Sequence, residues 1–480
     1  MKKIQNFIDG KLVAPISGNY LDNINPATGE VYSLIPDSDE RDVELAVAAA
    51  QKVFPLWSMM AKEKRSAILV KLSELIQNRL EEFALAESID NGKPVWLART
   101  VDIPRAVSNF HFYGTGILHQ SNDSHSMENT ALNYTLRTPI GIAGCISPWN
   151  LPLYLFSWKI APALASGNCV VAKPSEITPM TAFMLSELCN EAGLPSGVLN
   201  IIHGLGPKVG MSIVAHPKIP VISFTGGTKT GETIARVAAP MFKKMSLELG
   251  GKNPNIIFAD CDFDHAVKTT VKSSFSNQGE ICLCGSRVFV ERPLYEKFKT
   301  AFVAEAKKLT VGDPLNDQTK MGAIVSEVHY KKILEYLELA KTEGGKIILG
   351  GSSVNPGGKN SKGFFIEPTI IEGLSYDCRT NQEEIFGPVV TIMPFDTEEE
   401  VLKYANSTNY GLAATLWTTN LARTHRMAAN IESGIIWVNC WLIRDLRTPF
   451  GGMKSSGMGR EGGFEALNFF TEEKNVCIKF

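Results

Sequence analysis

A cysteine at position 282 lies in a segment whose composition suits an exposed nucleophile. The segment from Phe275 to Arg287 combines glycine, amide and hydroxyl residues, and it joins a helical pattern to a predicted strand. A free thiol has a pKa of about 8.5 and is mostly protonated at neutral pH, so a nucleophilic Cys282 needs activation by its surroundings. Taken by itself, Cys282 is also consistent with an inert buried thiol, which is the commoner state of a cysteine.

A carboxylate and an amide elsewhere in the chain could assist such a nucleophile. Glu248 lies in the sequence LELGGK, and Asn150 lies in PWNLP. A carboxylate can accept a proton as a general base, and an amide N–H can stabilise the negative oxygen that forms when a thiol attacks a carbonyl. Each residue alone has a commoner structural explanation, because glutamates are mostly solvated and asparagines often lie in turns or caps. Cys284 has no part in this chemistry and is expected to be a packing thiol.

Two glycine clusters follow predicted strands and could hold phosphate groups at a helix N-terminus. The first, GLGPKVG at 204–210, has one residue too many for the GxGxxG fingerprint, so an ordinary strand-to-helix turn explains it equally well. The second, GGTKTGET at 226–233, nearly matches a nucleoside triphosphate loop, but Glu232 stands where the phosphate-binding lysine should be. An anion there would repel a triphosphate, which excludes ATP and leaves a dinucleotide pyrophosphate.

Alternating strand and helix patterns must position these residues. From about residue 140, β-rich runs such as IGIAGCIS and PVISFTGG alternate with helical patterns, and a second series from 254 to 440 includes NPNIIFA and PVVTIMPF. This alternation predicts two parallel sheets covered by helices, and therefore two lobes that meet near Gly250. Before them, the apolar spacing over 67–85 predicts one amphipathic helix. The polar stretch 119–131 precedes a predicted strand, and the tail FFTEEKNVCIKF also predicts one; we expect both to protrude and to pair with another subunit.

Composition narrows the class of partner. The chain has 480 residues and a formal net charge of −2, so no positive field favours nucleic acid or an anionic membrane. Its nine cysteines are scattered without disulfide or zinc spacing, which favours a reducing cytoplasm and predicts no metal site. No signal peptide and no run of apolar residues long enough for a membrane span is predicted. A small-molecule partner is therefore expected.

Five separated motifs together resemble the aldehyde dehydrogenase superfamily. They are the Cys282 segment, LELGGK at 247–252, PWN at 148–150, EEIFGP at 383–388 and PFGGMK at 449–454. They occur in the order that the family has and span nearly the whole chain. The resemblance implies an α/β fold with a Rossmann-type NAD-binding lobe, an α/β catalytic lobe and a small β oligomerisation element. The implied segments are 1–118 and 139–249 for the NAD-binding lobe, 250–462 for the catalytic lobe, and 119–138 and 463–480 for the oligomerisation element.

The resemblance also assigns chemical roles. It implies that Cys282 is the nucleophile, that the Asn150 amide and the Cys282 backbone N–H form an oxyanion hole, and that Glu248 activates the water that hydrolyses a thioester. Such a reaction would convert an aldehyde and NAD into an acid and NADH. A homodimer or homotetramer is implied as well.

The same family pattern predicts the cofactor contacts. Lys173 and Glu176 are similar to the pair that binds the adenosine ribose, and the charge of Glu176 should disfavour the 2′-phosphate of NADP. Glu384 and Phe386 correspond to the contacts at the nicotinamide end. Gly227 departs from the pattern, because many relatives have a serine there. The remaining expected cofactor contacts are Trp149, Gly206, Gly210, Phe224, Gly226 and Leu249.

Two arginine segments resemble the subgroup of the family that acts on 2-aminomuconate and 2-hydroxymuconate semialdehydes. They are DIPRA, which contains Arg105, and NCWLIRDLR, which contains Arg444 and Arg447. A guanidinium group is suited to a carboxylate, so Arg105 and Arg444 are expected to hold the end of an anionic aldehyde remote from its reacting carbon, with Arg447 competing for that role. Surface or interlobe salt bridges are the structural alternative for these arginines.

Three other functions stay open at this level. A broad-specificity dehydrogenase for neutral aldehydes would use the arginines structurally. A coenzyme A-acylating dehydrogenase is disfavoured because Glu248, which favours hydrolysis, is present. A noncatalytic NAD-binding or structural protein is disfavoured by the presence of Cys282, Glu248 and Asn150 together. The amino and hydroxy forms of the semialdehyde are not distinguished.

Overall fold

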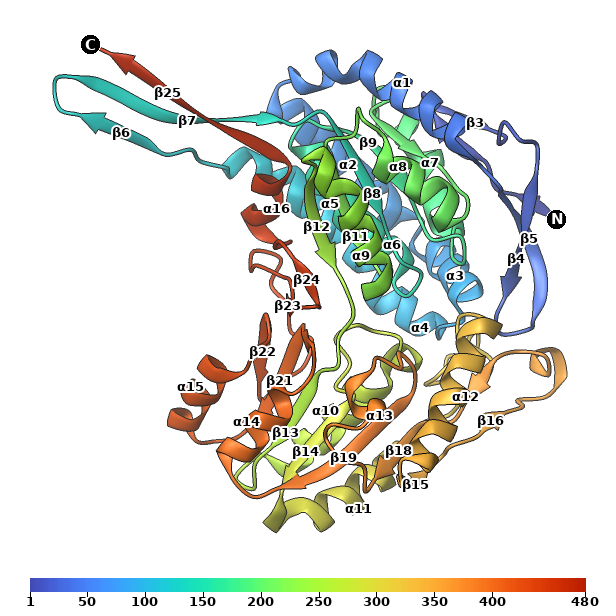
Figure 1. The fold of residues 1–480 in the computed structure, drawn as a ribbon. Helices are drawn as coiled ribbons and strands as arrows, with labels where there is room; N and C mark the ends of the chain where they lie inside the picture. The colour runs from blue at the N-terminus through green and yellow to red at the C-terminus, as the bar shows by residue number, and fades with distance from the viewer.

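The computed structural model describes residues 1–480 and has two α/β lobes and a projecting arm (Figure 1). One lobe contains an eight-stranded sheet with the order β24-β12-β11-β8-β9-β10-β2-β3. Its five central strands are parallel, whereas β2 and β24 pair with it antiparallel. The strands are β2 (Asn6–Ile8), β3 (Lys11–Val13), β8 (Ile142–Ile146), β9 (Cys169–Lys173), β10 (Leu199–Ile201), β11 (Val221–Thr225), β12 (Lys244–Glu248) and β24 (Gly457–Met458).

The strand order reverses beside β8, which creates a crevice at the carboxyl ends of the strands. The helices of this lobe are α1 (Glu40–Ser58), α6 (Pro152–Ala165), α7 (Met180–Glu191), α8 (Met211–Ala215) and α9 (Thr228–Ala238). Helix α6 is buried along its whole length, since most of its residues are apolar and it packs against the sheet and other helices. Both β8 and β9 are fully buried, as expected for parallel strands covered on two faces.

The second lobe is built on a seven-stranded sheet with the order β15-β18-β19-β14-β13-β21-β22. All neighbours are parallel except β15 and β18. The strands are β13 (Pro254–Ile257), β14 (Arg287–Glu291), β15 (Lys346–Leu349), β18 (Thr369–Glu372), β19 (Val389–Phe395), β21 (Ala413–Trp417) and β22 (Ile435–Val438). The main helices are α10 (Phe263–Phe275), α11 (Tyr295–Ala306), α12 (Glu327–Thr342), α14 (Glu398–Asn406) and α15 (Leu421–Asn430).

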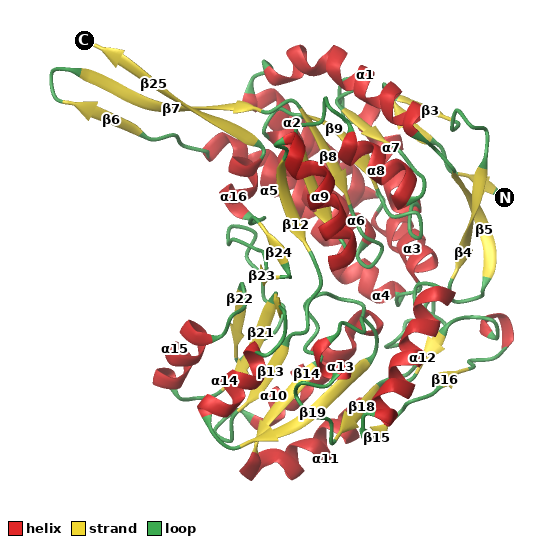
Figure 2. Cartoon of the chain, in the orientation of Figure 1, coloured by secondary structure: helices red, strands yellow, loops and turns green.

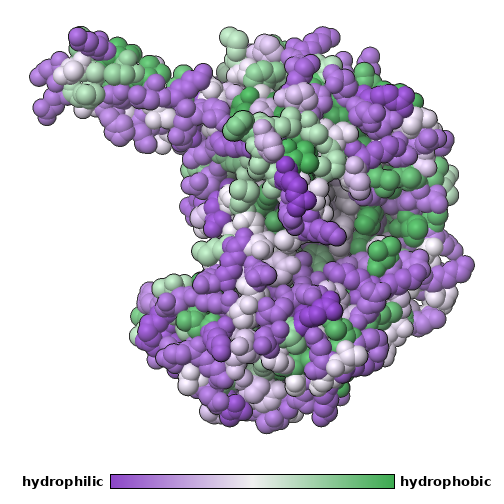
Figure 3. Space-filling model, in the orientation of Figure 1, coloured by the Kyte–Doolittle hydropathy of each residue, from purple (hydrophilic) through white to green (hydrophobic).

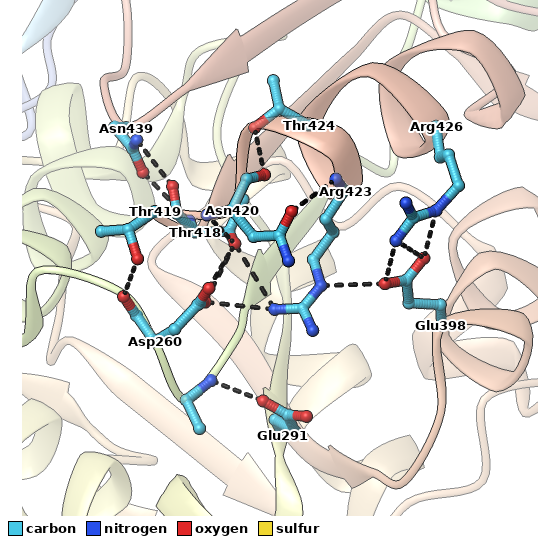
Figure 4. Close-up of polar contacts among 11 residues, drawn as sticks. Asp260, Glu291, Glu398, Thr418, Thr419, Asn420, Arg423, Thr424, Arg426 and Asn439 are labelled. Atoms are coloured by element: carbon cyan, nitrogen blue, oxygen red, sulfur yellow. Dashed lines mark hydrogen bonds and ion pairs between the residues drawn. The ribbon is translucent and has the colours of Figure 1, made fainter.

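An ion-pair network links the segment after β13 to helices α14 and α15 (Figure 4). Arg423 on α15 donates to Glu398 on α14 at 2.9 Å and to Asp260 after β13 at 3.1 Å. Its guanidinium group lies 4.1 Å from the ring centre of Phe258. The network lies at the surface and touches none of the cavities described below, so its role is structural.

A long β arm extends from the first lobe (Figure 2). It consists of β6 (Ser124–Met127), β7 (Ala131–Pro139) and β25 (Thr471–Lys479), in the order β25-β7-β6. Strand β25 pairs with β7 antiparallel from Thr471↔Pro139 to Lys479↔Ala131. A smaller sheet of β1 (Lys2–Lys3), β4 (Tyr20–Asn25) and β5 (Glu30–Pro36) flanks the first lobe on the other side.

The mixed α/β fold confirms the predicted fold class, but the helix predicted over 67–85 is wrong as a single element. The chain forms α2 (Lys62–Asn78) and α3 (Leu80–Asn91), which are separated at Arg79. Arg79 has φ −111° and ψ 25°, and its backbone N–H bonds to Gln77 and Ile76 instead of the residue four positions earlier. The apolar spacing continues across the break because both helices bury the same side of the chain. No helix has the length and apolar character needed to cross a membrane.

Candidate active site

Cys282 lies in the loop between α10 and β14, at the interface of the two lobes. The preceding turn, η5 (Ser276–Gly279), holds Asn277 and Gln278 at φ 51° and 55°, a conformation that side chains rarely adopt. The Asn277 amide donates to the Asn150 and Glu280 carbonyls, and the Gln278 amide donates to the Ala323 carbonyl. Asn253 also donates to the Cys282 carbonyl at 2.7 Å. These bonds fix the loop in its unusual conformation.

Apart from a void of about 20 Å³, the half-buried Cys282 side chain lines two cavities. One, of about 180 Å³, continues toward the glycines of the first lobe, and the other, of about 270 Å³, extends toward Arg105 and Arg444. Burial and the nearby Glu248 and Glu384 carboxylates raise the pKa of the Cys282 thiol. The thiol therefore holds its proton until an acceptor or a positive charge arrives.

Asn150 and Glu248 lie at the ends of strands that meet at Cys282. Asn150 follows β8, and its side-chain amide donates to the Glu280 carbonyl at 3.0 Å, which leaves its second N–H for another acceptor. Glu248 ends β12 and lines the larger cavity beside Cys282. Its Oε1 is buried and has no hydrogen-bond partner. Burial and the Glu461 carboxylate raise the pKa of Glu248 well above its usual value.

A third cavity of about 540 Å³ contains most of the residues predicted to bind the cofactor. Lys173 at the end of β9 forms an ion pair with Glu176 at 2.7 Å, and the other Glu176 oxygen accepts from the Gly206 backbone at 3.3 Å. Burial opposes ionisation, but Lys173 keeps the pKa of Glu176 below its usual value. Glu176 is therefore a charged acceptor at this end of the cavity. The predicted contacts that line this cavity are Trp149, Lys173, Glu176, Gly206, Gly210, Phe224, Gly226 and Gly227.

The two glycines after β11 differ in what they require. A Cβ on Gly226 would lie 2.4 Å from the Phe224 ring, so packing demands glycine there. A Cβ on Gly227 would meet no atom within 4 Å, so the missing side chain at this position leaves open space beside the cofactor cavity. Any phosphate contact at Gly227 has to come from the backbone.

Aromatic side chains lie at the other end of the region predicted to bind the cofactor, away from Glu176. Trp149, Phe386 and His329 pack together, with ring centres 5.2 to 6.2 Å apart. Glu384 accepts from the Gly251 backbone at 2.8 Å and lines the 180 Å³ cavity with Leu249 and Cys282. This cavity shares Trp149, Gly226 and Gly227 with the 540 Å³ cavity, so one surface runs from Glu176 to the thiol.

Sequence reasoning missed two residues at this aromatic end. His329 on α12 bonds through Nε2 to the Phe386 carbonyl at 2.6 Å, and Phe386 has φ +62°. Burial lowers the pKa of His329 to about 4, so the ring is neutral. Lys332, one turn later, donates to the Glu384 carbonyl at 3.1 Å. Nothing in the sequence distinguishes these residues from other polar positions of an amphipathic helix.

The 270 Å³ cavity combines cationic groups and the acidic residues Asp102, Glu248 and Glu461 with apolar walls. Arg444 donates to the Tyr154 hydroxyl at 2.8 Å and stacks 4.0 Å from the Phe450 ring centre, while Arg105 lies 5.6 Å from the Tyr154 ring centre. Neither arginine has a carboxylate partner among the ion pairs of the chain. Lys272 on α10 also lines this cavity and was not predicted. The apolar wall includes Leu97, Val101, Leu151, Leu155, Trp441 and Ile443.

Arg447 lies elsewhere. Its side chain is 78% exposed and pairs with Asp445 at 2.7 Å, and it does not line the cavity. The Asp445 carboxylate two residues earlier pairs with this guanidinium group, and Arg447 therefore lies outside the lining of the 270 Å³ cavity. No group of three or more His, Cys, Asp or Glu side chains is arranged to hold a metal ion.

Comparisons with known proteins agree with this geometry. The model of the aldehyde dehydrogenase family matches residues 13–476. The chain is 50% identical over 479 residues to a 2-aminomuconic semialdehyde dehydrogenase of Bos taurus, which covers 99% of this chain and 98% of that protein. It is 44% identical over 485 residues to a 2-hydroxymuconic semialdehyde dehydrogenase of Pseudomonas sp. (strain CF600), with both chains fully covered. The NAD+ complex of an aldehyde dehydrogenase from Bacillus cereus superposes with a TM-score of 0.97 at 39% identity, over 100% of this chain and 97% of that one.

Proposed function

The chain belongs to the aldehyde dehydrogenase family, and from that premise we propose that it oxidises a carboxylate-bearing semialdehyde of the 2-aminomuconate or 2-hydroxymuconate type to the corresponding diacid. The enzyme is an oxidoreductase that uses NAD(P). The observation that carries the substrate proposal is the pair of arginines without carboxylate partners, Arg105 and Arg444, at the end of the cavity that begins at Cys282. Its apolar walls suit an unsaturated carbon chain between aldehyde and carboxylate.

The proposed chemistry begins with Cys282. Its sulfur bonds to the aldehyde carbon, the thiol proton passes to solvent water, and the carbonyl electron pair moves to the oxygen. The free N–H of Asn150 and the Cys282 backbone N–H stabilise the resulting oxyanion. The surface from Lys173 and Glu176 to Glu384 would hold NAD(P), which would supply the hydride acceptor when bound; loss of hydride from this carbon would leave a Cys282 thioester.

Hydrolysis of the thioester then depends on Glu248. The unpaired Oε1 of Glu248 can accept a proton from a water molecule in the same cavity. The hydroxide attacks the thioester carbon, the carbon–sulfur bond breaks, and the acid leaves while Cys282 regains its proton. Because burial raises the pKa of Glu248, its carboxylate is a stronger base than a solvated one.

The charge of Glu176 supports NAD as the preferred cofactor. Replacement of Glu176 by Gln is expected to raise kcat/KM for NADP relative to NAD by roughly tenfold, because a 2′-phosphate would no longer face a carboxylate. The measurement is the ratio of the two kcat/KM values for one aldehyde. Glu191→Gln is the matched control, since Glu191 is an exposed glutamate on α7 of the same lobe. A wild-type enzyme that uses both cofactors equally would contradict the proposal.

The arginines provide the test of the substrate proposal. Arg105→Ala and Arg444→Ala are each expected to lower kcat/KM for 2-hydroxymuconate semialdehyde roughly 10- to 100-fold, because each removes a charge-assisted hydrogen bond to the substrate carboxylate. Oxidation of a neutral aldehyde of similar length should change little. Arg447→Ala, which removes an exposed arginine three residues after Arg444, should leave both activities unchanged.

Two results would argue for a broad dehydrogenase of neutral aldehydes instead. One is a wild-type enzyme that oxidises neutral and anionic aldehydes equally well. The other is an equal loss of both activities in Arg105→Ala and Arg444→Ala, which would assign these arginines to folding. Either result leaves the aldehyde dehydrogenase chemistry of Cys282 intact.

We also propose that the chain forms a homodimer or homotetramer through its arm. The arm exposes large apolar side chains on all three of its strands and at the C-terminus, and Figure 3 shows green and white patches near its tip. They are Met127, Leu136, Ile478 and Phe480. Strand β25 is at the sheet edge, so its outer backbone groups are free to pair with another copy. We propose 119–138 and 463–480 as the oligomerisation element, 1–118 and 139–249 as the cofactor-binding lobe, and 250–462 as the catalytic lobe.

A further inference from the structure

A buried lysine lies directly behind the oxyanion side of the site. Lys93 follows α3 and precedes α4 (Val95–Leu97), and its side chain is fully buried. Its ammonium group forms an ion pair with Asp102 and donates to the Asn150 carbonyl at 3.1 Å. Lys93 lines none of the three cavities, so it cannot touch substrate or cofactor. Because a buried charge is costly, its position calls for a role in arranging other groups.

The first contact of Lys93 fixes the turn that carries the Asn150 side chain. The Asn150 carbonyl accepts from both Lys93 and Asn277, each at 3.1 Å. The preceding Trp149 carbonyl accepts from Asn91 at 3.0 Å. The turn is therefore held through its backbone, and the second N–H of the Asn150 amide is left free to face the reacting carbonyl. Lys93 provides the only charged donor among these contacts.

The second contact reaches the other end of the aldehyde cavity. Asp102 is the last residue of the π-helical turn η1 (Ala98–Asp102), which runs directly into α5 (Ile103–Gly116). Arg105 is on the first turn of α5 and lines the cavity at the end proposed to bind the substrate carboxylate. One ammonium group thus contacts both the turn that carries Asn150 and the helix start that carries Arg105.

We propose that Lys93 is a positioning residue that fixes the distance between the oxyanion donor Asn150 and the carboxylate-binding Arg105. Asn150 receives the aldehyde end of the substrate and Arg105 the carboxylate end. Lys93 therefore makes the enzyme selective for the separation between these two groups. The roles of Arg105 and Asn150 both rest on the proposed function, whereas the contacts of Lys93 with the two segments that carry them do not.

A third carboxyl group offers a way to separate the two contacts. Glu87 Oε1 lies 3.9 Å from the Lys93 ammonium group and has no hydrogen-bond partner, and Glu87 Oε2 accepts from the Leu153 backbone. Burial raises the pKa of Glu87 to about 8, and the charge of Asp102 contributes to this rise. Replacing Asp102 by Asn would favour ionisation of Glu87, which could then serve as the counter-ion of Lys93. Lys93 would keep its bond to Asn150 but lose its link to α5.

The experiment compares two variants with two substrates. In Lys93→Met/Asp102→Asn, both contacts are lost without leaving a buried charge, and kcat for a neutral aldehyde is expected to fall roughly 10- to 100-fold because the oxyanion donor is misplaced. In Asp102→Asn alone, neutral-aldehyde kcat should persist, while kcat/KM for the anionic semialdehyde should fall, although Asp102 lines the cavity and the loss of its negative charge alone would favour an anion. The dependence of kcat/KM on chain length, measured with a series of carboxylate-bearing aldehydes, should also weaken in both variants.

The control is a buried cation in the same lobe with no contact to the site. Arg65 on α2 is buried and donates to the Ala165 carbonyl at 3.2 Å, so Arg65→Met should lower thermal stability without changing chain-length selectivity. The inference is overturned if Lys93→Met/Asp102→Asn and Asp102→Asn both behave like Arg65→Met, with a lower Tm and unchanged kinetics. If the double variant does not fold, the Asp102→Asn substrate comparison decides the coupling. Equal use of both aldehydes by the wild type would remove the proposed substrate but not the Asn150 contact, which the neutral aldehyde still tests.

Discussion

Replacement of Cys282 by Ala is expected to lower kcat for every aldehyde by roughly 10⁴-fold or more, since no other group can form the covalent intermediate. Cys282 carries the one thiol shared by the 180 Å³ and 270 Å³ cavities. The measurement is NADH absorbance under saturating aldehyde and NAD. Quenching of tryptophan fluorescence by NAD, to which Trp149 should contribute, should be retained and would show that the variant still binds cofactor.

Cys284→Ala is the matched control for this loss. Cys284 lies two residues away, is buried and has no partner other than its packing neighbours and backbone, so its removal costs packing rather than chemistry. Activity should persist in Cys284→Ala. Retention of substantial activity in Cys282→Ala, or its loss only in Cys284→Ala, would contradict the assignment of the nucleophile.

The state of the Cys282 thiol adds a pH dependence to this prediction. Burial raises its pKa, so in the absence of NAD the thiol is protonated at neutral pH. Alkylation of wild-type enzyme by iodoacetamide should therefore be slow at pH 7 and accelerate as the pH rises through the alkaline range, because only the thiolate reacts. The modified residue should be absent from Cys282→Ala.

Sequence patterns could predict that Asn150 and Glu248 lie near each other because each lies at or after the carboxyl end of a parallel strand. Asn150 follows β8, Glu248 ends β12, and Cys282 lies in the loop that leads into β14. Parallel strands bring their carboxyl ends to one edge, so alternating patterns plus short motifs are enough to place the first two together. Cys282 comes from the other lobe, and only the family resemblance connected it with them. Its chemical role remains a prediction.

The contacts that could not be predicted lie on helices or depend on distant backbone. His329 and Lys332 face the cofactor surface from α12, where a polar residue at helical spacing has no distinctive signal. Lys93 holds Asn150 through a carbonyl 57 positions away, and no local pattern encodes such a contact. The distinction between Arg444 and Arg447 also required the structure, since both occur within one short segment and only the position of Asp445 separates their surroundings.

Glu248→Gln is expected to lower steady-state kcat roughly 10²- to 10⁴-fold, because an amide cannot accept the proton of the hydrolytic water. The change preserves the shape of the side chain in its buried position. If hydrolysis is the step that fails, mixing with aldehyde and NAD should give a rapid burst of about one NADH per active site, followed by slow turnover. Intact-mass spectrometry should then detect the acyl group on Cys282, which supplies a readout independent of the rate.

Glu280→Gln makes the same change in another buried carboxyl group near the nucleophile. The Glu280 carboxyl accepts from the Val325 backbone and lines neither the aldehyde cavity nor the cofactor surface. Turnover without an accumulated acyl-enzyme is therefore expected in this variant. The comparison separates loss of a base from the general effect of neutralising a buried carboxyl.

The pH profile gives the sign of the Glu248 contribution. Burial and Glu461 raise the pKa of Glu248, so at low pH its carboxyl group is protonated and cannot act as a base. Wild-type kcat should rise as the pH increases through this raised pKa, and that rise should be absent from Glu248→Gln. A burst slowed as much as steady-state turnover, with no acyl-enzyme, would contradict the hydrolytic role, because it would place the requirement for Glu248 before the thioester forms, at removal of the Cys282 proton.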